Sequence, residues 1–448
     1  VQASGAEGRV DYLFSANRYR TDGWRDHAAA RRDLANAKLG VTLANGGRLQ
    51  WAFNRVRIDA QDPLGLTAEQ FASAPKSAPL AAQYDTRKTV RQNQAGLLWE
   101  HDLDAGQQLR VMLYRGRRET VQYQSIPPSA QTNPRLGGGV IDLQRDSGGL
   151  DVRCLGGIEL GGRPLAWAAG LSYDDLEERR KGYENFLGSA DAPQLGVRGA
   201  LRRQERNGVT SLDPYLQATW FLTDAWSLEA GVRRSRLRFD SRDQYITAGN
   251  GDDSGRVRHA RTLPVAALRW QPADDLALYV SAGRGFETPT LNELSYRPDG
   301  EGGLNFHLRP AINDNVEFGA KARVAGGLLT AALFETRTRN EIVTARSSGG
   351  RTTFQNAGRT RRQGFELGWQ HETADHWQTR LALSWLDARY RDSFCSPAPC
   401  ASAADQVAKG RRIHGVARMA MFASVGWPPP TGWRAGVDMH ALGCIEAH

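Results

Sequence analysis

Residues 315–323 read NVEFGAKAR, a stretch in which polar residues or glycine alternate with apolar residues without a break. A period of two places Val316 and Phe318 on one face of an extended strand and the polar residues on the other. The same alternation holds for GFELGWQ at residues 364–370 and for SLEAGVR at residues 227–233. The sequence therefore predicts strands that have one apolar and one polar face.

Short turns recur along the chain about 50 to 60 residues apart, with two alternating stretches and a longer polar loop between successive turns. The turns are expected at Ala44–Gly47, Asp102–Gly106, Gly161–Arg163, Thr223–Trp226, Pro272–Asp275, Ala325–Gly327, Glu372–His376 and Pro428–Gly432. Tryptophans fall beside several of these turns, as in an aromatic girdle at a membrane interface. They are Trp220, Trp226, Trp270, Trp369, Trp427 and Trp433. This order predicts an all-β, antiparallel, up-and-down transmembrane barrel with short periplasmic turns and long external loops.

Composition permits this fold without proving it. The chain has 448 residues, 40% of them hydrophobic, and no apolar run approaches the roughly 18 residues that a membrane helix needs. A soluble β-sandwich with core aromatics is the alternative, but sandwiches do not sustain a hairpin period of this length. The net charge of +9 comes without any nucleic-acid-binding motif, so we expect no nucleic-acid partner.

We count about 17 strands between residues 10–19 and residues 436–441, and an odd number does not close a bacterial barrel. We therefore expect an incomplete barrel. The chain begins at Val1 without a signal peptide, so we interpret it as a fragment or a mature segment.

Motifs for catalysis are missing from the sequence: there is no G-x-S-x-G, no P-loop, no H-E-x-x-H and no C-x-x-C. We expect neither an enzyme nor a bound cofactor. The segment GNGDDSG at residues 249–255 resembles part of a calcium loop, but no bidentate Glu closes the frame, which favours a solvated turn. Cys395 and Cys400 flank a short loop segment and predict a disulfide; coincidence or half of a metal site are alternatives, although no His lies near the pair.

Binding has more support than catalysis, because basic and aromatic residues lie side by side in the long loops. Guanidinium groups bind carboxylates in a bidentate manner and aromatic rings stack on flat ligands. The candidate ligand-binding residues are Arg179, Arg180, Lys181, Tyr183, Phe186, Arg202 and Arg203. The alternative is that these charges lie on the loop rim and contact lipopolysaccharide or one another.

A series of linked motifs then carries a resemblance to a known family. In order, they are SAGRGFETPTLNEL at 281–294, LNFHLRP at 304–310, NVEFG at 315–319, ALF at 332–334, NEI at 340–342, QNAG at 355–358 and QGFE at 363–366. Together they are similar to the barrel domain of TonB-dependent outer-membrane receptors. DGWRDH at 22–27, AQDPLGLT at 60–67 and TRKT at 86–89 extend the resemblance over nearly the whole chain.

Within that family, three loop segments are most similar to the enteric-type receptor for pyrroloquinoline quinone. They are RRKGYENF at 179–186, QSIP at 124–127 and YITAGNGDDSG at 245–255. The resemblance implies an outer-membrane receptor of a Gram-negative bacterium that binds a scarce anionic ligand for uptake energised by the TonB-ExbB-ExbD complex. Its surroundings would be outer-membrane lipid and lipopolysaccharide. Alternatives are a receptor for a ferric siderophore or ferric citrate, a passive porin, or an adhesin.

The family barrel has 22 strands and an N-terminal plug in its lumen. We therefore expect residues 1–448 to form a partial barrel domain that lacks the plug, with its TonB-contact segment, and about the last five strands. The part of a family binding site that the plug apices supply has no counterpart in these residues.

Overall fold

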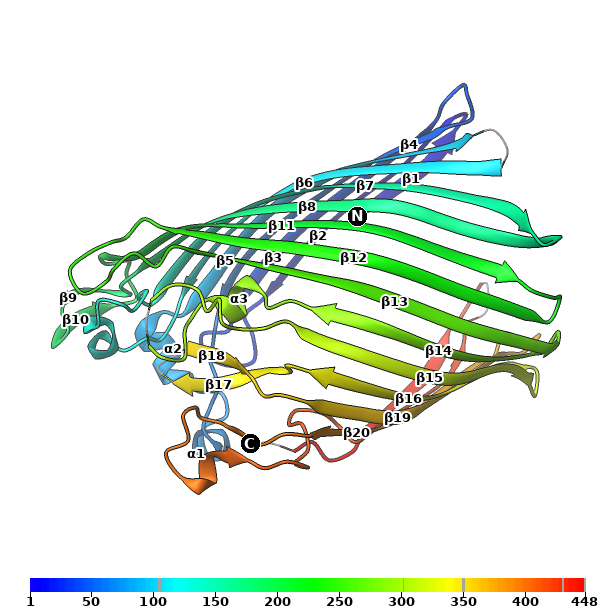
Figure 1. The fold of residues 1–448 in the computed structure, drawn as a ribbon. Helices are drawn as coiled ribbons and strands as arrows, with labels where there is room; N and C mark the ends of the chain where they lie inside the picture. Colours follow the sequence, from blue (N-terminus) through cyan, green and yellow to red (C-terminus); the bar gives the residue numbers. More distant parts are fainter. Residues whose placement is uncertain (104–105, 301, 349–350, 429–430, 447–448) are drawn as a thin grey trace.

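The computed structural model describes residues 1–448 except 104–105, 301, 349–350, 429–430 and 447–448. Eighteen strands form one antiparallel sheet in which each strand pairs with its neighbours along the chain (Figure 1). They are β1 (Gln2–Glu7), β2 (Val10–Thr21), β3 (Ala30–Thr42), β4 (Arg48–Gln61), β5 (Arg87–Leu103), β6 (Gln107–Tyr123), β7 (Val140–Leu160), β8 (Arg163–Tyr183), β11 (Leu201–Phe221), β12 (Trp226–Asp243), β13 (Gly255–Ala273), β14 (Leu276–Glu287), β15 (Ala311–Val324), β16 (Gly327–Arg339), β19 (Thr360–Glu372), β20 (Gln378–Tyr390), β23 (Met419–Trp427) and β24 (Ala435–Leu442). The sheet curves into the wall of a wide barrel, which confirms the predicted fold class.

The predicted count of about 17 strands was wrong by one. The strand we did not recognise is β1, which reads QASGAE and has no bulky apolar residue to reveal an alternation. It pairs with β2 from Gln2 opposite Ser15 to Glu7 opposite Val10. Because 18 is even, the number of strands no longer supports the expectation of an incomplete barrel, which was based on an odd count. Within the described residues, β1 forms a ladder only with β2, and β24 only with β23.

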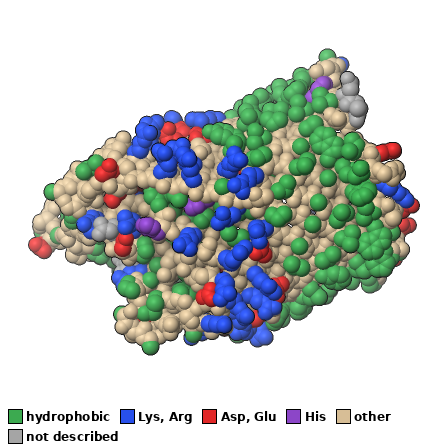
Figure 2. All heavy atoms as spheres, viewed as in Figure 1, with side chains coloured by type: hydrophobic (Ala, Val, Ile, Leu, Met, Phe, Trp, Pro, Cys, Tyr) green, Lys and Arg blue, Asp and Glu red, His purple; other side chains and the backbone are tan. Residues whose placement is uncertain are grey.

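The alternation seen in the sequence separates the two faces of the wall. On β15, Val316 and Phe318 are 55% and 51% exposed, as expected for side chains that face lipid. Glu317 lies between them on the opposite face and accepts a hydrogen bond of 2.6 Å from the hydroxyl of Tyr279. Figure 2 shows the outward apolar side chains as a broad belt over the half of the barrel that carries the short turns. The protein therefore presents an apolar surface outward and a polar lumen.

Six of the eight predicted turns join consecutive strands as expected. The other two, Asp102–Gly106 and Pro428–Gly432, include residues that lie outside the described ranges. Tryptophans do gather at this end: the rings of Trp226 and Trp270 stack with centroids 5.5 Å apart, and the Nε1–H of Trp369 donates to the carbonyl of Val324.

The long connections lie together at the opposite end of the barrel and carry the remaining elements (Figure 1). These are α1 (Ala68–Ser73), α2 (Pro79–Tyr84), η2 (Pro128–Thr132), β9 (Phe186–Ser189), β10 (Ala192–Leu195), α3 (Leu291–Leu294), β17 (Ile342–Ser348), β18 (Arg351–Asn356), β21 (Phe394–Cys395), η3 (Ala403–Asp405) and β22 (Gln406–Val407). Among the described residues, no helix is both long enough and apolar enough to cross a membrane.

One of these connections, between β14 and β15, folds back onto the inner wall. Its Leu294, Leu304 and Leu308 are almost fully buried and form a cluster with Phe239 of β12. Val209 of β11 packs against the same cluster. Burial of this much apolar surface fixes the connection inside the mouth of the barrel, where it carries polar residues close to the wall.

Candidate functional site

The period of two divides the basic run of β8 between the two faces of the wall. Arg180 lies on the inner face and is 7% exposed, whereas Arg179 and Lys181 on either side of it are exposed on the outer face. Arg179 forms an ion pair of 3.3 Å with Glu177, which is also on the outer face. The structure therefore brings only one of these three predicted residues into the barrel.

The other four predicted residues occupy different environments. Arg203 is on the inner wall at the start of β11, where its Nε donates to Glu205. Arg202 lies at a register shift in the β8–β11 ladder and donates through Nη2 to the carbonyl of Asn133 at 2.6 Å. Tyr183 forms a cation–π contact with a loop arginine: the guanidinium carbon of Arg198 lies 4.6 Å from the centroid of its ring.

Phe186, the last of the predicted set, is 6% exposed at the start of β9. Little of its ring is therefore left for stacking on a ligand.

Arg180 and Arg203 meet around a residue that the sequence did not single out, Tyr296. The guanidinium carbons of Arg180, Arg203 and Arg351 lie 5.4, 5.6 and 5.0 Å from the centroid of its ring. Arg180 also donates to the hydroxyl of Tyr296 at 3.1 Å. Three cations around one aromatic ring repel one another but are each attracted by its π face. We call these four residues the Arg–Tyr cluster.

A short helix holds Tyr296 in this position. Thr290 and Glu293 form a capping box at the start of α3: the backbone amide of Glu293 donates to the Thr290 hydroxyl and the amide of Thr290 donates to the Glu293 carboxylate. Ser295 follows α3 and accepts from Arg180 Nη1 at 2.6 Å through its hydroxyl and from Arg203 Nη1 at 2.9 Å through its carbonyl. The two arginines therefore join β8 and β11 to the end of α3.

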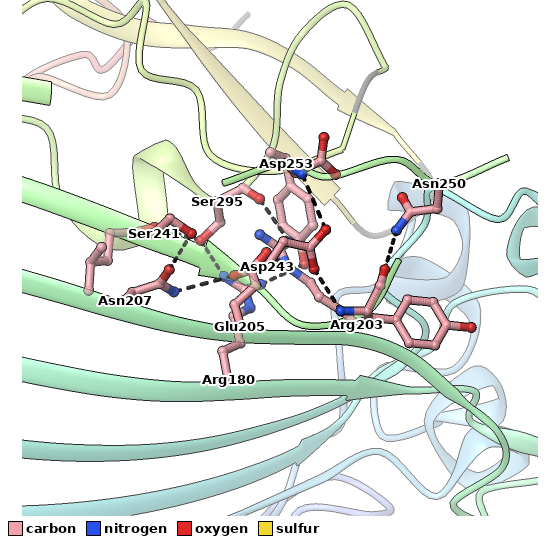
Figure 3. A network of polar contacts seen from close by, with 12 residues as sticks. Arg180, Arg203, Glu205, Asn207, Ser241, Asp243, Asn250, Asp253 and Ser295 are labelled. Atoms are coloured by element: carbon pink, nitrogen blue, oxygen red, sulfur yellow. Dashed lines mark hydrogen bonds and ion pairs between the residues drawn. The ribbon is translucent and has the colours of Figure 1, made fainter. Parts of the chain in front are cut away.

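A buried polar network lies beneath the cluster on the same inner wall (Figure 3). Asn207, which is fully buried, donates to Glu178 at 3.0 Å and to Glu205 at 3.3 Å and accepts from Ser241 at 2.7 Å. Glu178 also accepts from Arg145 at 2.6 Å. Because buried carboxylates require hydrogen bonds or opposite charges, this network fixes the two acids that partly neutralise the arginines above them.

A cavity of about 250 Å³ opens beside the Arg–Tyr cluster. Among the described residues of its wall are six arginines and three carboxylates. The arginines are Arg135, Arg202, Arg203, Arg297, Arg346 and Arg351, and the acids are Glu205, Asp243 and Asp253. The side chain of Arg203 is only 11% exposed, and its Nη2 has no hydrogen-bond partner among the described residues. Arg351 forms no ion pair with any described carboxylate. The described residues of the cavity wall therefore carry an excess of positive charge and include a donor without a described hydrogen-bond partner.

The acidic side of the cavity is organised by Asp243, the last residue of β12. Its carboxylate accepts from the backbone amides of Tyr245 at 2.9 Å and Asp253 at 3.3 Å, which closes the connection to β13 (Figure 3). Burial and the neighbouring Asp243 raise the pKa of Asp253. Its carboxyl group is thus easier to protonate than an ordinary aspartate.

The cluster changes the acidity of its own members. Burial alone would raise the pKa of Tyr296, but the positive charges of Arg180, Arg203 and Arg351 outweigh burial and lower it. Burial and repulsion from Arg203 and Arg180 lower the pKa of Arg351. Crowded positive charge contributes to both shifts, alongside burial for Arg351, and a bound anion would relieve the crowding.

Two central members of the cluster were not predicted. The T-x-x-E pattern at residues 290–293 was a readable signal for the helix that presents Tyr296. No local pattern marks Arg351, which reaches the ring only because β18 lies against α3 in the folded protein. Within the described residues, no three His, Cys, Asp or Glu side chains are arranged to hold a metal ion. Cys395 and Cys400 are joined in a disulfide, with Cα atoms 5.1 Å apart.

Comparison with known proteins gives a family match for residues 6–443 to the model described as "TonB dependent receptor-like, beta-barrel". Solved structures with the same fold include the ferric citrate transporter FecA in its unliganded form, at 14% identity and a TM-score of 0.76 over 98% of this chain. Others are the siderophore receptor PiuA from Acinetobacter baumannii, at 15% identity and 0.73 over 95%, and the ferric yersiniabactin uptake receptor FyuA from Yersinia pestis, at 16% and 0.73 over 98%. The chain spans 62%, 66% and 65% of these three proteins, respectively.

Proposed function

Because the chain belongs to the TonB-dependent receptor β-barrel family, which resides in the outer membrane of Gram-negative bacteria, we propose that it captures a scarce anionic ligand at the long-loop end of its barrel. The observation that carries this proposal is the cavity beside the Arg–Tyr cluster. Arg203 and Arg351 present cationic donors there that the described part of the chain does not neutralise completely. Charge-assisted hydrogen bonds to a carboxylate are among the stronger interactions available to such a site.

The size of the cavity limits what it can hold. A typical drug-sized pocket has about 300–1,000 Å³, so a cavity of about 250 Å³ suits a compact anion or one arm of a larger ligand. Pyrroloquinoline quinone, with three carboxylates on a planar ring system, is the ligand that the loop resemblance implies, and it remains our first candidate. Its carboxylates would bind Arg203, Arg351 and Arg202, and its ring would lie near Tyr296.

A ferric chelate is the second candidate. Similar solved structures include the ferric citrate transporter FecA and the siderophore receptor PiuA, and ferric citrate is also anionic. The same arginines would serve for either ligand. Because the described residues contain no group of metal-ligating side chains, we expect iron to enter only as part of such a chelate.

Uptake would need energy from the TonB-ExbB-ExbD complex, delivered through a plug in the lumen, with residues 1–448 acting as the barrel domain around it. The family is one of transport receptors, so we assign no catalytic role and no resident cofactor. The outer surface would contact membrane lipid and lipopolysaccharide.

Calorimetric titration of the purified receptor with pyrroloquinoline quinone, and with ferric citrate in parallel, tests the proposal. Saturable binding of the quinone alone supports the first candidate. Binding of ferric citrate alone assigns the protein to iron uptake. Absence of binding by both would overturn the proposed anion specificity, and the family assignment would stand.

A further inference from the structure

The β17–β18 hairpin, which supplies part of the cavity wall at the long-loop end (Figure 1), contains an irregularity in its ladder. Thr344 lies opposite Phe354. The next pair joins Arg346 to Thr353, which leaves Ala345 as an extra residue on β17, a β-bulge. A shift of one residue moves the following side chains to the other face of a strand. The bulge therefore sets the face on which Arg346 lies beside Thr353 in the wall of the cavity.

The bulge is covered by residues 394–407 of the β20–β23 connection, which we call the disulfide loop. Ala345 is fully buried, and its carbonyl accepts a hydrogen bond of 2.9 Å from the backbone amide of Ala398. Ala398 lies inside the ring that the disulfide between Cys395 and Cys400 closes. Because a bulge leaves a residue outside the ladder, a buried carbonyl there needs another donor. The disulfide loop supplies that donor.

The disulfide loop also contacts both strands of the hairpin near its base. Gln355 of β18 donates through Nε2 to the carbonyl of Cys395 at 2.5 Å. Phe394 and Val407, at the two ends of the loop, pack against an apolar cluster that contains Val343 of β17. These contacts anchor the base of the loop, whereas the contact with the bulge is made from inside the ring that the disulfide closes.

Charge joins the disulfide loop to the cavity wall as well. The carboxylate of Asp405 accepts hydrogen bonds from the backbone amides of Ser402 and Ala401, both at 2.7 Å. These hydrogen bonds and, to a smaller extent, the positive charge of Arg346 lower the pKa of Asp405. Arg346 lines the same cavity as Arg351. The loop therefore acts on a cation of the cavity through its own acid.

We propose that the disulfide between Cys395 and Cys400 positions the cationic wall of the cavity, so that its reduction lowers the affinity for the anionic ligand. The bond restricts the conformations of the residues that donate to the bulge. Once the bond is open, the hairpin loses a fixed donor, and Arg346 and Arg351 must be ordered when a ligand binds. The inference rests on the proposed function, because it concerns the regulation of the same site.

Reduction needs an external reagent, a small dithiol. One of its thiolates attacks a sulfur of the disulfide, forms a mixed disulfide and releases the other cysteine as a thiolate. The second thiol of the reagent then displaces the first cysteine. The protein gains two electrons and two protons, and the dithiol is oxidised to its own disulfide. Cys395 and Cys400 are half-buried between exposed neighbours such as Pro399 and Ala401, so a small dithiol can reach the bond.

Calorimetric titration with pyrroloquinoline quinone and with ferric citrate tests the proposal. The reference protein is the receptor with Cys154→Ser and Cys444→Ser, which keeps the disulfide and removes the two free thiols. The open variant adds Cys395→Ser with Cys400→Ser, and heat-modifiable migration in gels verifies its folding. A second open form is the folded reference protein after reduction by dithiothreitol and blocking by iodoacetamide. Both reagents are removed before titration, because thiols reduce quinones and ferric iron.

We expect both open forms to bind the ligand about three- to tenfold more weakly than the reference protein, since one or two side chains must be ordered on binding. In a background with Arg346→Gln and Arg351→Gln, opening should cause no further loss, because the cations that the disulfide positions are absent. Hydrogen–deuterium exchange without ligand should be faster in β17 and β18 of the open forms. The β9–β10 hairpin serves as the internal control and should exchange at an unchanged rate.

Unchanged affinity of the open forms, an equal loss in the background without the two arginines, or unchanged exchange in β17 and β18 would overturn the proposal. Absence of binding by the reference protein would instead overturn the proposed function, and with it the regulation of affinity. The exchange measurement would then still decide whether the disulfide holds the hairpin in place.

Discussion

The guanidinium of Arg351 lies over the ring of Tyr296, with 5.0 Å between its central carbon and the ring centroid. Arg180 and Arg203 approach the same ring from the barrel wall. Of the three, Arg203 is balanced by Glu205 and Arg180 lies near the same acid, whereas Arg351 has no ion pair with a described carboxylate. Arg351 is therefore the cation that an incoming anion would neutralise most directly.

Replacement of Arg351 by Gln should weaken binding of an anionic ligand by about 10- to 100-fold, the equivalent of one charge-assisted hydrogen bond of about 1.5–3 kcal/mol. Calorimetric titration with pyrroloquinoline quinone or ferric citrate, whichever the wild-type protein binds, measures the effect. Arg179→Gln is the matched control, because Arg179 is exposed on the outer face of β8. Equal affinities of the Arg351→Gln and wild-type proteins would remove Arg351 from the site.

Anion binding should weaken as the pH rises from neutral into the alkaline range. The three arginines lower the pKa of Tyr296 from its ordinary value of 10.0 despite burial. Between the lowered folded value and 10, the folded protein carries a phenolate while the unfolded chain is still protonated. The lowered pKa of Tyr296 therefore adds to the free energy of unfolding. This contribution is complete above pH 10 and is lost as the pH falls through the pKa of Tyr296 in the folded protein. The phenolate that forms neutralises part of the cationic cluster, so it competes with an anionic ligand.

Titrations at intervals from neutral pH up to the ordinary tyrosine pKa of 10.0 measure this dependence. Tyr296→Phe keeps the ring and removes the ionisable hydroxyl, so its affinity should stay level over the same interval. A decline of equal steepness in Tyr296→Phe would assign the effect to another group.

The sequence predicted the strands far better than the site, and the reason is physical. Alternation in segments such as residues 315–323 arises because one face of the wall lies in lipid and the other faces the lumen. The sequence of each strand is therefore sufficient to predict its two faces. β1 was not predicted because its residues are small or polar and do not alternate between an apolar and a polar face. Site residues depend on contacts between distant segments: Arg180 and Tyr296 are 116 residues apart, and only the folding of the α3 connection into the barrel joins them.

The two-residue period of a β-strand also predicts which basic residues of β8 face the lumen and which face outward. Arg180 and Lys181 are adjacent in sequence and therefore lie on opposite faces of the strand. Applied to residues 179–181, the alternation predicts one inward and two outward side chains, as the structure shows. For long strands that extend beyond the membrane, strand parity is thus a better guide to site residues than clustering of charge.

Substitution of Asn207 by Asp should destabilise the barrel by more than about 1 kcal/mol, because Asn207 donates to Glu178 and Glu205 from a fully buried position. A third carboxylate there would replace two favourable hydrogen bonds with repulsion. The urea concentration at the midpoint of unfolding, followed by gel migration, measures the change. Asn93→Asp, at an exposed position of β5, should leave the midpoint unchanged. A midpoint of Asn207→Asp equal to that of the wild type would show that the network contributes no stability.

Replacement of Gly319 by Ala should also destabilise the barrel, because a tyrosine ring already occupies the space beside this glycine. A Cβ atom at position 319 would lie 2.2 Å from the ring of Tyr279, its direct neighbour on β14. Tyr279 is fixed there by its hydrogen bond to Glu317, so the ring is not free to turn away. Overpacking of this kind costs about 1–3 kcal/mol. Gly251→Ala is the control, since no atom lies within 4 Å of the added carbon. The double variant with Tyr279→Phe, which releases the ring from Glu317, should recover part of the lost unfolding midpoint; no recovery would show that the ring is held by packing rather than by that hydrogen bond.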